Sequence, residues 1–389
     1  MLPRAFTEEQ QMFRDAYRKF LAAEIVPHME SWRDQGRVDR SAFEAAGAQG
    51  FLMVWPDEAY GGMGDDDFRF EQVIIEETAY ARCGDWYNTL HSRLVGPYLT
   101  RFGNEEQRQR FLPKAVLGEC IMAIAMTEPD AGSDLAGMRT TAIEHDDHWV
   151  LNGSKTYISN GINADLVFVA AKTDPENNPH HMTIFMVERG MEGFERGRNL
   201  KKMGLKAQDT AELFFNDVKI PKANVLGEAG RGFIYLMEGL AEERLIGAVG
   251  YLAAAQLSWD LTYDYVRQRK VFGKPLAAHQ NTQFKMAEMR TELDLAQSYV
   301  DQCVAAFNAG QLSAVDAAKA KLVTSELQVS AADLGVQMAG GCSLCLPYQQ
   351  KEETMVELFD AIGNIKLPII DPGNSGQSCQ ISKTYFTRI

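Results

Sequence analysis

The stretch Met126-Thr127-Glu128-Pro129-Asp130-Ala131-Gly132-Ser133-Asp134 marks the point at which the character of this chain changes. The apolar run from Cys120 to Ala125 precedes it and predicts a buried strand. Pro129 and Gly132 argue against a continuous helix or a central strand over the stretch itself. We therefore predict an irregular loop, rich in hydroxyls and backbone N–H groups, that can hold a flat cofactor or an anion. The same composition also fits an ordinary surface turn, so the stretch alone leaves both interpretations open.

After this loop the hydrophobic pattern is that of strands. Residues 138–145 alternate, and Asp146-Asp147 predicts a turn. Further strands are expected over 149–159, 166–172, 182–188 and 211–218. The pattern predicts a β domain, a barrel or a sandwich.

The rest of the chain has helical periodicity. Thr7-Glu8-Glu9-Gln10 fits a capping box at the start of the first helix. Further helices are expected over 42–49, 68–81, 90–102 and from residue 104, with Pro113 interrupting the last, and then over 233–269, 282–308 and 314–338. The fold class expected is α+β with an α–β–α plan: an N-terminal helical domain (1–120), the β domain (121–230) and a C-terminal helical domain (231–389).

Composition narrows the class of protein. With 389 residues, 46% of them hydrophobic, the chain can build two or three domains with sizeable cores. A net charge of −14 disfavours a nucleic-acid partner. The six cysteines lack the spacing of secreted disulfides, residues 1–20 lack an apolar signal core, and the uncharged run 245–259 is too short to span a membrane. We predict a cytoplasmic protein without integral membrane association.

Two common kinds of site are not predicted. No GxGxxG follows a strand, so a Rossmann cofactor site is unsupported. His145 with His148, and His180 with His181, sit at turns without a set of further ligands at suitable spacing. We therefore predict no metal site.

A second stretch, Asn152-Gly153-Ser154-Lys155-Thr156-Tyr157-Ile158-Ser159-Asn160-Gly161, gives the first loop a function. The pair resembles the flavin-binding signature of the acyl-CoA dehydrogenase family, which most often has Trp and Thr at positions 157 and 159. Tyr and Ser keep the aromatic wall and the hydroxyl that a flavin ring needs. The resemblance implies an FAD cofactor, with Ser133 also contacting substrate and with flavin contacts from Met126, Thr127, Gly132, Ser133, Tyr157 and Ser159.

The stretch Leu240-Ala241-Glu242-Glu243-Arg244-Leu245 carries the candidate base. Charged residues on a helix are ordinarily solvated, but no charge occurs between Leu245 and Trp259, so this helix turns mostly inward. The stretch resembles the long-chain and isovaleryl branches of the family, which keep their catalytic Glu here, directly before an Arg. That resemblance implies that Glu243 is the base and that Arg244 helps to hold the acyl-CoA. Residues 87–102 also resemble the long-chain branch, in its helix on the substrate side.

A third signature, Arg267 to Pro275, is explained by helix capping alone: a basic last turn, Gly273 and then Pro275. The resemblance adds that Arg269 and Phe272 contact the FAD of a neighbouring subunit, which implies a dimer or tetramer. In the same way Gln337-Met338-Ala339-Gly340-Gly341 implies FAD contacts from Gln337 and Gly341.

The activity implied is α,β-dehydrogenation of medium- or long-chain acyl-CoA thioesters to 2-enoyl-CoA. A carboxylate removes the α-proton, hydride leaves for the flavin, and an electron-transferring flavoprotein takes the electrons. The alternatives are an oxidase or monooxygenase on this scaffold, or a non-catalytic homologue. The motifs stop at Gly341: the tail 342–389, with Cys342 and Cys345, lacks the family's Gly-Thr-x-Glu-Ile loop, so a weak or cofactor-leaky enzyme is expected.

Overall fold

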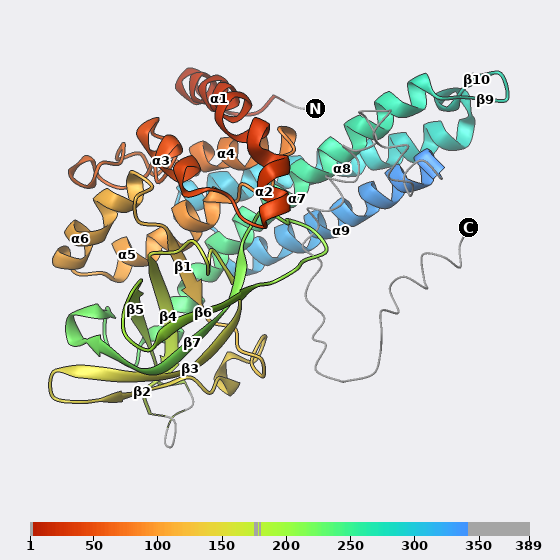
Figure 1. The fold of residues 1–389 in the computed structure, drawn as a ribbon. Coiled ribbons are helices and arrows are strands. Elements are labelled where there is room, and N and C mark those ends of the chain that lie inside the picture. Colours follow the sequence, from red (N-terminus) through yellow and green to blue (C-terminus); the bar gives the residue numbers. More distant parts are fainter. Residues whose placement is uncertain (1–2, 175–177, 179, 341–389) are drawn as a thin grey trace, which may run out of the picture.

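The computed structural model describes residues 3–174, 178 and 180–340 (Figure 1). An N-terminal group of helices is followed by a β-sheet and then by three long helices, so the predicted α–β–α architecture is confirmed. The sheet region begins at β1 (Met122–Ala125) and the long helices begin at α7 (Gly232–Gln268). The division at 120/121 and 230/231 stays a prediction.

The N-terminal helices start as their caps predict. The Thr7 hydroxyl accepts from the backbone N–H of Gln10, whose side chain accepts from the backbone N–H of Thr7. Pro113 does not interrupt its helix, so that prediction is wrong; one backbone hydrogen bond is lost, but Leu112 and Val116 are buried and hold the helix by packing. The helices are α1 (Glu8–Phe20), α2 (Met29–Gln35), α3 (Arg40–Ala48), α4 (Phe68–Tyr80), α5 (Gly96–Phe102) and α6 (Glu105–Val116), with π-helical turns at Leu21–Ile25 and Leu90–Val95.

The sheet has eight strands in the order β6-β7-β3-β2-β4-β5-β8, with β1 paired to β4. β2 pairs with β4 in parallel through Thr141 and Lys172. The predicted alternation from residue 138 was too long, because β2 begins only at Thr141. The strands are β2 (Thr141–Glu144), β3 (His148–Ser159), β4 (Leu166–Lys172), β5 (Met182–Glu188), β6 (Phe194–Asn199), β7 (Thr210–Pro221) and β8 (Val225–Leu226).

The long helices α7, α8 (Gln280–Asn308) and α9 (Ala314–Ala339) pack side by side. The uncharged part of α7 faces inward as expected, with Leu245, Val249 and Leu252 buried. A short hairpin of β9 (Lys270–Val271) and β10 (Lys274–Pro275) joins α7 to α8 at the end remote from the sheet (Figure 1). Within the described part of the chain, no helix is both long enough and apolar enough to cross a membrane.

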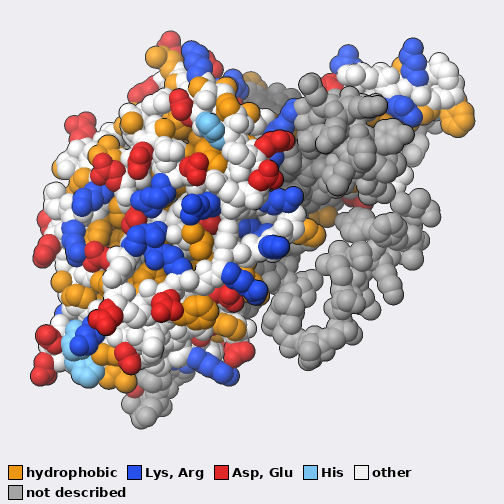
Figure 2. All heavy atoms as spheres, in the orientation of Figure 1, with side chains coloured by type: hydrophobic (Ala, Val, Ile, Leu, Met, Phe, Trp, Pro, Cys, Tyr) orange, Lys and Arg blue, Asp and Glu red, His pale blue; other side chains and the backbone are white. Residues whose placement is uncertain are grey.

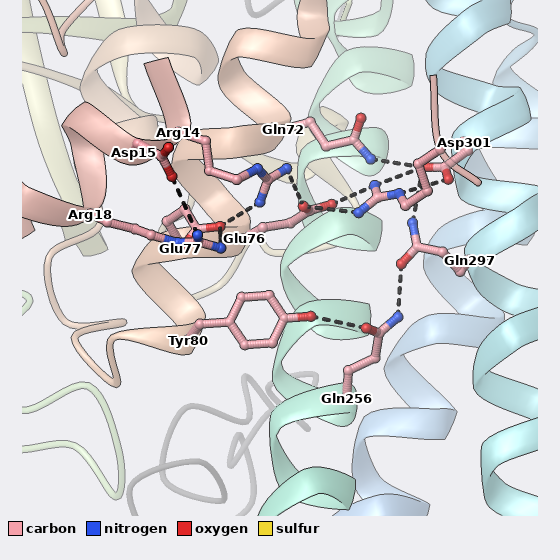
Figure 3. A network of polar contacts seen from close by, with 11 residues as sticks. Arg14, Asp15, Arg18, Gln72, Glu76, Glu77, Tyr80, Gln256, Gln297 and Asp301 are labelled. Atoms are coloured by element: carbon pink, nitrogen blue, oxygen red, sulfur yellow. Dashed lines mark hydrogen bonds and ion pairs between the residues drawn. The ribbon is translucent and has the colours of Figure 1, made fainter. Parts of the chain in front are cut away.

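A polar network fixes α4 against the long helices. Arg4 donates to Glu76 on α4 at 2.7 Å and to Asp301 on α8 at 2.8 Å. The Tyr80 hydroxyl at the end of α4 donates to the side-chain oxygen of Gln256 on α7 at 2.9 Å (Figure 3). This network holds α4 and α7 in register, and these helices form two walls of the cavity described next. Its further members are Arg14, Arg18, Gln72, Glu77 and Gln297 (Figure 3).

Candidate active site

A cavity of about 400 Å³ lies between the N-terminal helices and the long helices, and Glu243 is on its wall. Glu243 is brought there by α7, whose residues Leu240, Gly247 and Gly250 also line the cavity. A wider hollow of about 580 Å³ between α1, α2 and α4 carries none of the predicted site residues. The remaining lining residues of the Glu243 cavity include Ile75, Thr78, Trp86, Tyr87, Asn88, Thr89, Leu94, Leu205, Arg244, Tyr251, Ala254, Leu257, Lys321 and Gln328.

Glu243 has the surroundings of a carboxylate that can take up a proton. Burial raises its pKa, and the neighbouring Glu242 raises it further. The hydroxyl of Tyr98 donates to Glu243 Oε1 at 3.0 Å, and this bond works in the opposite direction, as do the charges of Lys321 and Arg244. The net direction is upward, which makes Glu243 a stronger base than an exposed glutamate.

The adjacent Glu242 has a structural role, as the acceptor of two arginine side chains. It is buried, and its two oxygens accept from Arg93 Nε and from Arg101 Nη2, both at 2.5 Å. Arg93 also pairs with Asp66 at 2.7 Å. Glu242 therefore connects α7 to α5 and to the π-helical turn before it. Of the two adjacent carboxylates, only Glu243 lines the cavity.

The two flavin-type stretches lie together in the structure. Lys155 on β3 is buried and donates to Glu128 Oε1 at 2.7 Å and to the Met126 carbonyl at 3.0 Å. The backbone N–H of Thr156 donates to the Thr127 carbonyl at 2.9 Å. The loop after β1 is thus fastened to β3, and the six residues predicted to hold a flavin come from this junction.

The exposed groups at this junction suit a flavin ring. Tyr157 has φ of 59° and its ring is 43% exposed. The hydroxyls of Thr127, Ser133 and Ser159 make no hydrogen bond within the described residues, and a Cβ at Gly132 would meet no atom within 4 Å. Free hydroxyls beside an exposed aromatic face are the donor set that an isoalloxazine edge requires, so these residues fit FAD.

The third signature lies elsewhere in this chain. Phe272 has φ of 50° and is 96% exposed on the hairpin after α7. The 37 residues of α7 separate this hairpin from the sheet by about 55 Å of helix. Arg269 is exposed beside it, and Gln337 is exposed near the end of α9. Within one chain the structure does not bring Arg269 and Phe272 to Tyr157. Gly341 and the tail 342–389, with Cys342, Cys345 and Cys379, lie outside the described residues.

Sequence reasoning missed most of the cavity wall. Gly247, Gly250 and Ala254 present one face of α7 to the cavity, and their spacing of three and four residues is a signal that could have identified them. Asn88 and Gln328 also went unnoticed, because nothing in the sequence distinguishes a cavity-facing amide from a solvated one. His145 and His148 stack at 4.9 Å, and no cluster of three metal-ligating residues occurs in the described ranges.

Three family models match the chain in order: acyl-CoA dehydrogenase N-terminal domain over 7–119, middle domain over 123–218 and C-terminal domain over 230–359. The mitochondrial long-chain specific acyl-CoA dehydrogenase of Sus scrofa is 44% identical over 340 residues, 87% of this chain and 79% of that protein. The mitochondrial isovaleryl-CoA dehydrogenase of Pongo abelii is 37% identical over 342 residues, 86% of this chain and 80% of that protein. The crystal structure of an acyl-CoA dehydrogenase from Geobacillus kaustophilus matches with a TM-score of 0.90 and 42% identity, covering 100% of this chain and 99% of that one.

Proposed function

Because the chain belongs to the acyl-CoA dehydrogenase family of oxidoreductases, we propose that it uses FAD to oxidise medium- and long-chain acyl-CoA thioesters to 2-enoyl-CoA. The observation that carries this proposal is the position of Glu243, on the wall of a deep and largely apolar cavity with a raised pKa. A carboxylate placed in this way can remove a proton from an acyl chain that enters the cavity.

The roles of the chain's own groups follow from their contacts. Glu243 takes the α-proton of the thioester, and the hydroxyl of Tyr98 orients the carboxylate that does so. Arg244, on the cavity wall beside Glu243, helps to hold the acyl-CoA. The apolar walls exclude water, which keeps the carboxylate desolvated and basic. Bound FAD would supply the acceptor for the hydride that leaves the β-carbon.

The junction between the loop after β1 and strand β3 supports the FAD proposal. Met126, Thr127, Gly132 and Ser133 from the loop would hold the flavin, together with Tyr157 and Ser159 from the strand. A Bacillus anthracis acyl-CoA dehydrogenase solved in complex with FAD matches this chain with a TM-score of 0.81 and 30% identity, covering 94% of this chain and 66% of that one.

The length of the cavity supports a medium- or long-chain substrate. Its lining residues run along α7 from Leu240 to Leu257, a rise of about 25 Å. Gly247, Gly250 and Ala254 keep this face of the helix free of large side chains. An extended acyl chain can therefore lie along α7 beyond Glu243.

The exposed hairpin supports a homo-oligomer. The Phe272 side chain is 96% exposed on this hairpin, and the exposed Arg269 lies close to it in the sequence, so a neighbouring subunit has access to both. Figure 2 shows hydrophobic side-chain atoms at the outer end of this hairpin. In a dimer or tetramer, Arg269 and Phe272 of one subunit would reach the FAD of the next, and Gln337 would add a further contact.

An electron-transferring flavoprotein is the proposed acceptor. A solved chain described as the electron transferring flavoprotein of Acidaminococcus fermentans matches with a TM-score of 0.85 and 32% identity, covering 94% of this chain and 95% of that one. Nucleic acid is not proposed as a partner: acidic and basic side chains are interspersed over the face in Figure 2. A cytoplasmic location stays a prediction from composition.

Anaerobic mixing of the full-length holoprotein with an acyl-CoA series tests the proposal. We expect bleaching of the flavin absorbance by medium and long chains, and Glu243→Gln should lower the bleaching rate by about 10²-fold or more while FAD stays bound. Glu238→Gln, an exposed glutamate on the same helix, is the control. A colourless protein that takes up no FAD, or one bleached by no acyl-CoA, would favour a non-catalytic homologue. Rapid reoxidation of the reduced flavin by oxygen would favour an oxidase or monooxygenase.

A further inference from the structure

Two buried amide side chains on the cavity wall lack partners. Asn88 is 1% exposed, and its Nδ2 has no hydrogen-bond partner. Gln328 is 2% exposed, and its side chain makes no hydrogen bond with any described residue. Both line the Glu243 cavity, Asn88 from the segment between α4 and α5 and Gln328 from α9. We call Asn88 and Gln328 the amide pair.

Buried amides without partners are rare, since each loses its bonds to water and gains none in return. The buried amide of Gln256, by contrast, bonds to Gln297 at 2.7 Å and accepts from Tyr80 (Figure 3). That network also steadies the walls beside Ala79 and Ala254, which line the cavity. The amide pair therefore faces a space in which a ligand group can supply the missing bonds.

Gln328 lies farther along the cavity than the candidate base. On α9, Gln328 follows Lys321 by seven residues, a rise of about 10 Å. Lys321 is level with Gly247 on α7, since a Cβ at Gly247 would lie 3.9 Å from Lys321 Cε. The helices run in the same direction, because Arg244 reaches Ala314 near the start of α9 and Leu257 clusters with Ala339 at its end. Gln328 is therefore beyond the reacting carbons, on the side that receives the far part of the chain.

The hydrogen-bonding groups of the amide pair favour an uncharged oxygen on the bound acyl chain. A carboxamide both donates and accepts, which suits a hydroxyl or a ketone and does not neutralise a carboxylate. The cations that line the cavity, Lys321 and Arg244, are at the Glu243 end. Among the described residues that line the cavity, none beside Gln328 is a cation, so an uncharged polar group is favoured there.

We propose that this cavity accepts acyl-CoA thioesters whose chain carries a hydroxyl or ketone several carbons beyond the β-carbon, where Asn88 and Gln328 hydrogen-bond to it. The inference rests on the proposed function and specifies its substrate class. A plain alkyl chain leaves both amides unpaired, and a site built for a polar group discriminates against the analogue that lacks it.

The test compares straight-chain acyl-CoA thioesters with the same chains hydroxylated at successive carbons, using the full-length holoprotein. Affinity is measured by calorimetry in Glu243→Gln, where turnover is blocked, and flavin bleaching is measured in the parent. For one hydroxyl position we expect binding about tenfold tighter than that of the plain chain.

Asn88→Leu and Gln328→Met keep the side-chain size and remove the hydrogen bonds. Each should reduce the preference for the hydroxylated chain and improve binding of the plain chain. Gln302→Met, an exposed amide on α8, is the control and should change neither affinity. If Asn88→Leu does not fold, the affinities of Gln328→Met for the plain and hydroxylated chains test the inference.

The inference would be overturned, with the proposed function intact, if the parent bound plain chains as tightly as hydroxylated ones or more tightly, and if neither variant changed the ratio of the two affinities. If neither series reduces the flavin or binds, the proposed function fails and this inference fails with it.

Discussion

Lys155 and Glu128 form a buried ion pair, with 2.7 Å between Nζ and Oε1, that fastens the loop after β1 to strand β3. Burial lowers the pKa of Lys155 to about 8, while the Glu128 charge opposes this shift. Burial also acts to raise the pKa of Glu128, but Lys155 and the backbone N–H groups of Arg139 and Thr140 outweigh it and hold that pKa below its ordinary value. Every polar atom of the pair thus has a partner, and the loop carrying Thr127 is held in one position.

Removing one member of this pair should loosen the flavin junction. Lys155→Met leaves a buried carboxylate without its counter-charge, at a cost of about 3–5 kcal/mol of stability. We expect faster release of FAD and a lower midpoint of thermal unfolding. The double variant Lys155→Met with Glu128→Gln should recover part of both losses, because it removes the uncompensated charge. Unchanged FAD release in Lys155→Met would show that the loop is positioned by other contacts.

Tyr98→Phe should shift the pH dependence of flavin reduction. The Tyr98 hydroxyl stabilises the ionised form of Glu243, so its removal raises the pKa of that carboxyl further. Glu243 acts when ionised, and the rising limb of the bleaching rate against pH should therefore move to higher pH. Tyr60→Phe, which removes an exposed bond to Glu105, is the control. An unmoved limb would mean that Tyr98 has no influence on the base.

Glu71 should make the protein less stable as pH rises. Burial raises its pKa from 4.5 to about 7, with Thr89 and Arg93 opposing this shift. Between these two values the folded state binds the proton that the unfolded state has released, so stability falls with rising pH across that window, by roughly 3 kcal/mol. Urea unfolding at a series of pH values should show this decline in the parent and not in Glu71→Gln. The exposed Glu44→Gln should behave as the parent.

Gly250→Leu should shorten the preferred acyl chain. A Cβ at Gly250 would lie 3.5 Å from Ile75, an ordinary contact, so the change to Ala is tolerated and adds helix propensity. A leucine side chain extends beyond that contact and occupies cavity volume. We expect bleaching by long chains to fall at least tenfold relative to medium chains in Gly250→Leu, and little change in Gly250→Ala. An equal loss for all chain lengths would indicate misfolding rather than a shorter cavity.

Phe272→Ser should weaken the assembly and its hold on FAD. If subunits share the flavin site through this hairpin, light scattering should report a smaller particle, and FAD should be released faster. Met12→Ser, at another exposed apolar position (68% exposed), should leave both properties unchanged. A monomeric parent protein with full FAD content would remove the reason for this prediction.

The architecture could be predicted from short-range patterns in the chain, because capping motifs and hydrophobic periodicity specify helices and strands locally. The Thr7–Gln10 capping box and the periodicity of α7, α8 and α9 placed those helices nearly to the residue. The strands β4 and β5 were found because both are continuous apolar runs. The motif stretches also indicated the candidate base and the flavin loop, since they depend on residue types at short spacing.

Other features required the tertiary structure. Strand β6 carries Glu195 and Arg196 with little alternation, and it is a strand only because β7 pairs with it. Glu242 and Glu243 are adjacent and chemically identical, so the sequence does not distinguish them. In the structure Arg93 and Arg101, more than a hundred residues earlier in the chain, bind Glu242, whereas Glu243 lines the cavity. The amide pair has no signal in the sequence, because burial without a partner depends on which segments meet across the cavity. These features depend on contacts between residues far apart in the sequence, and short-range sequence patterns carry no information about such contacts.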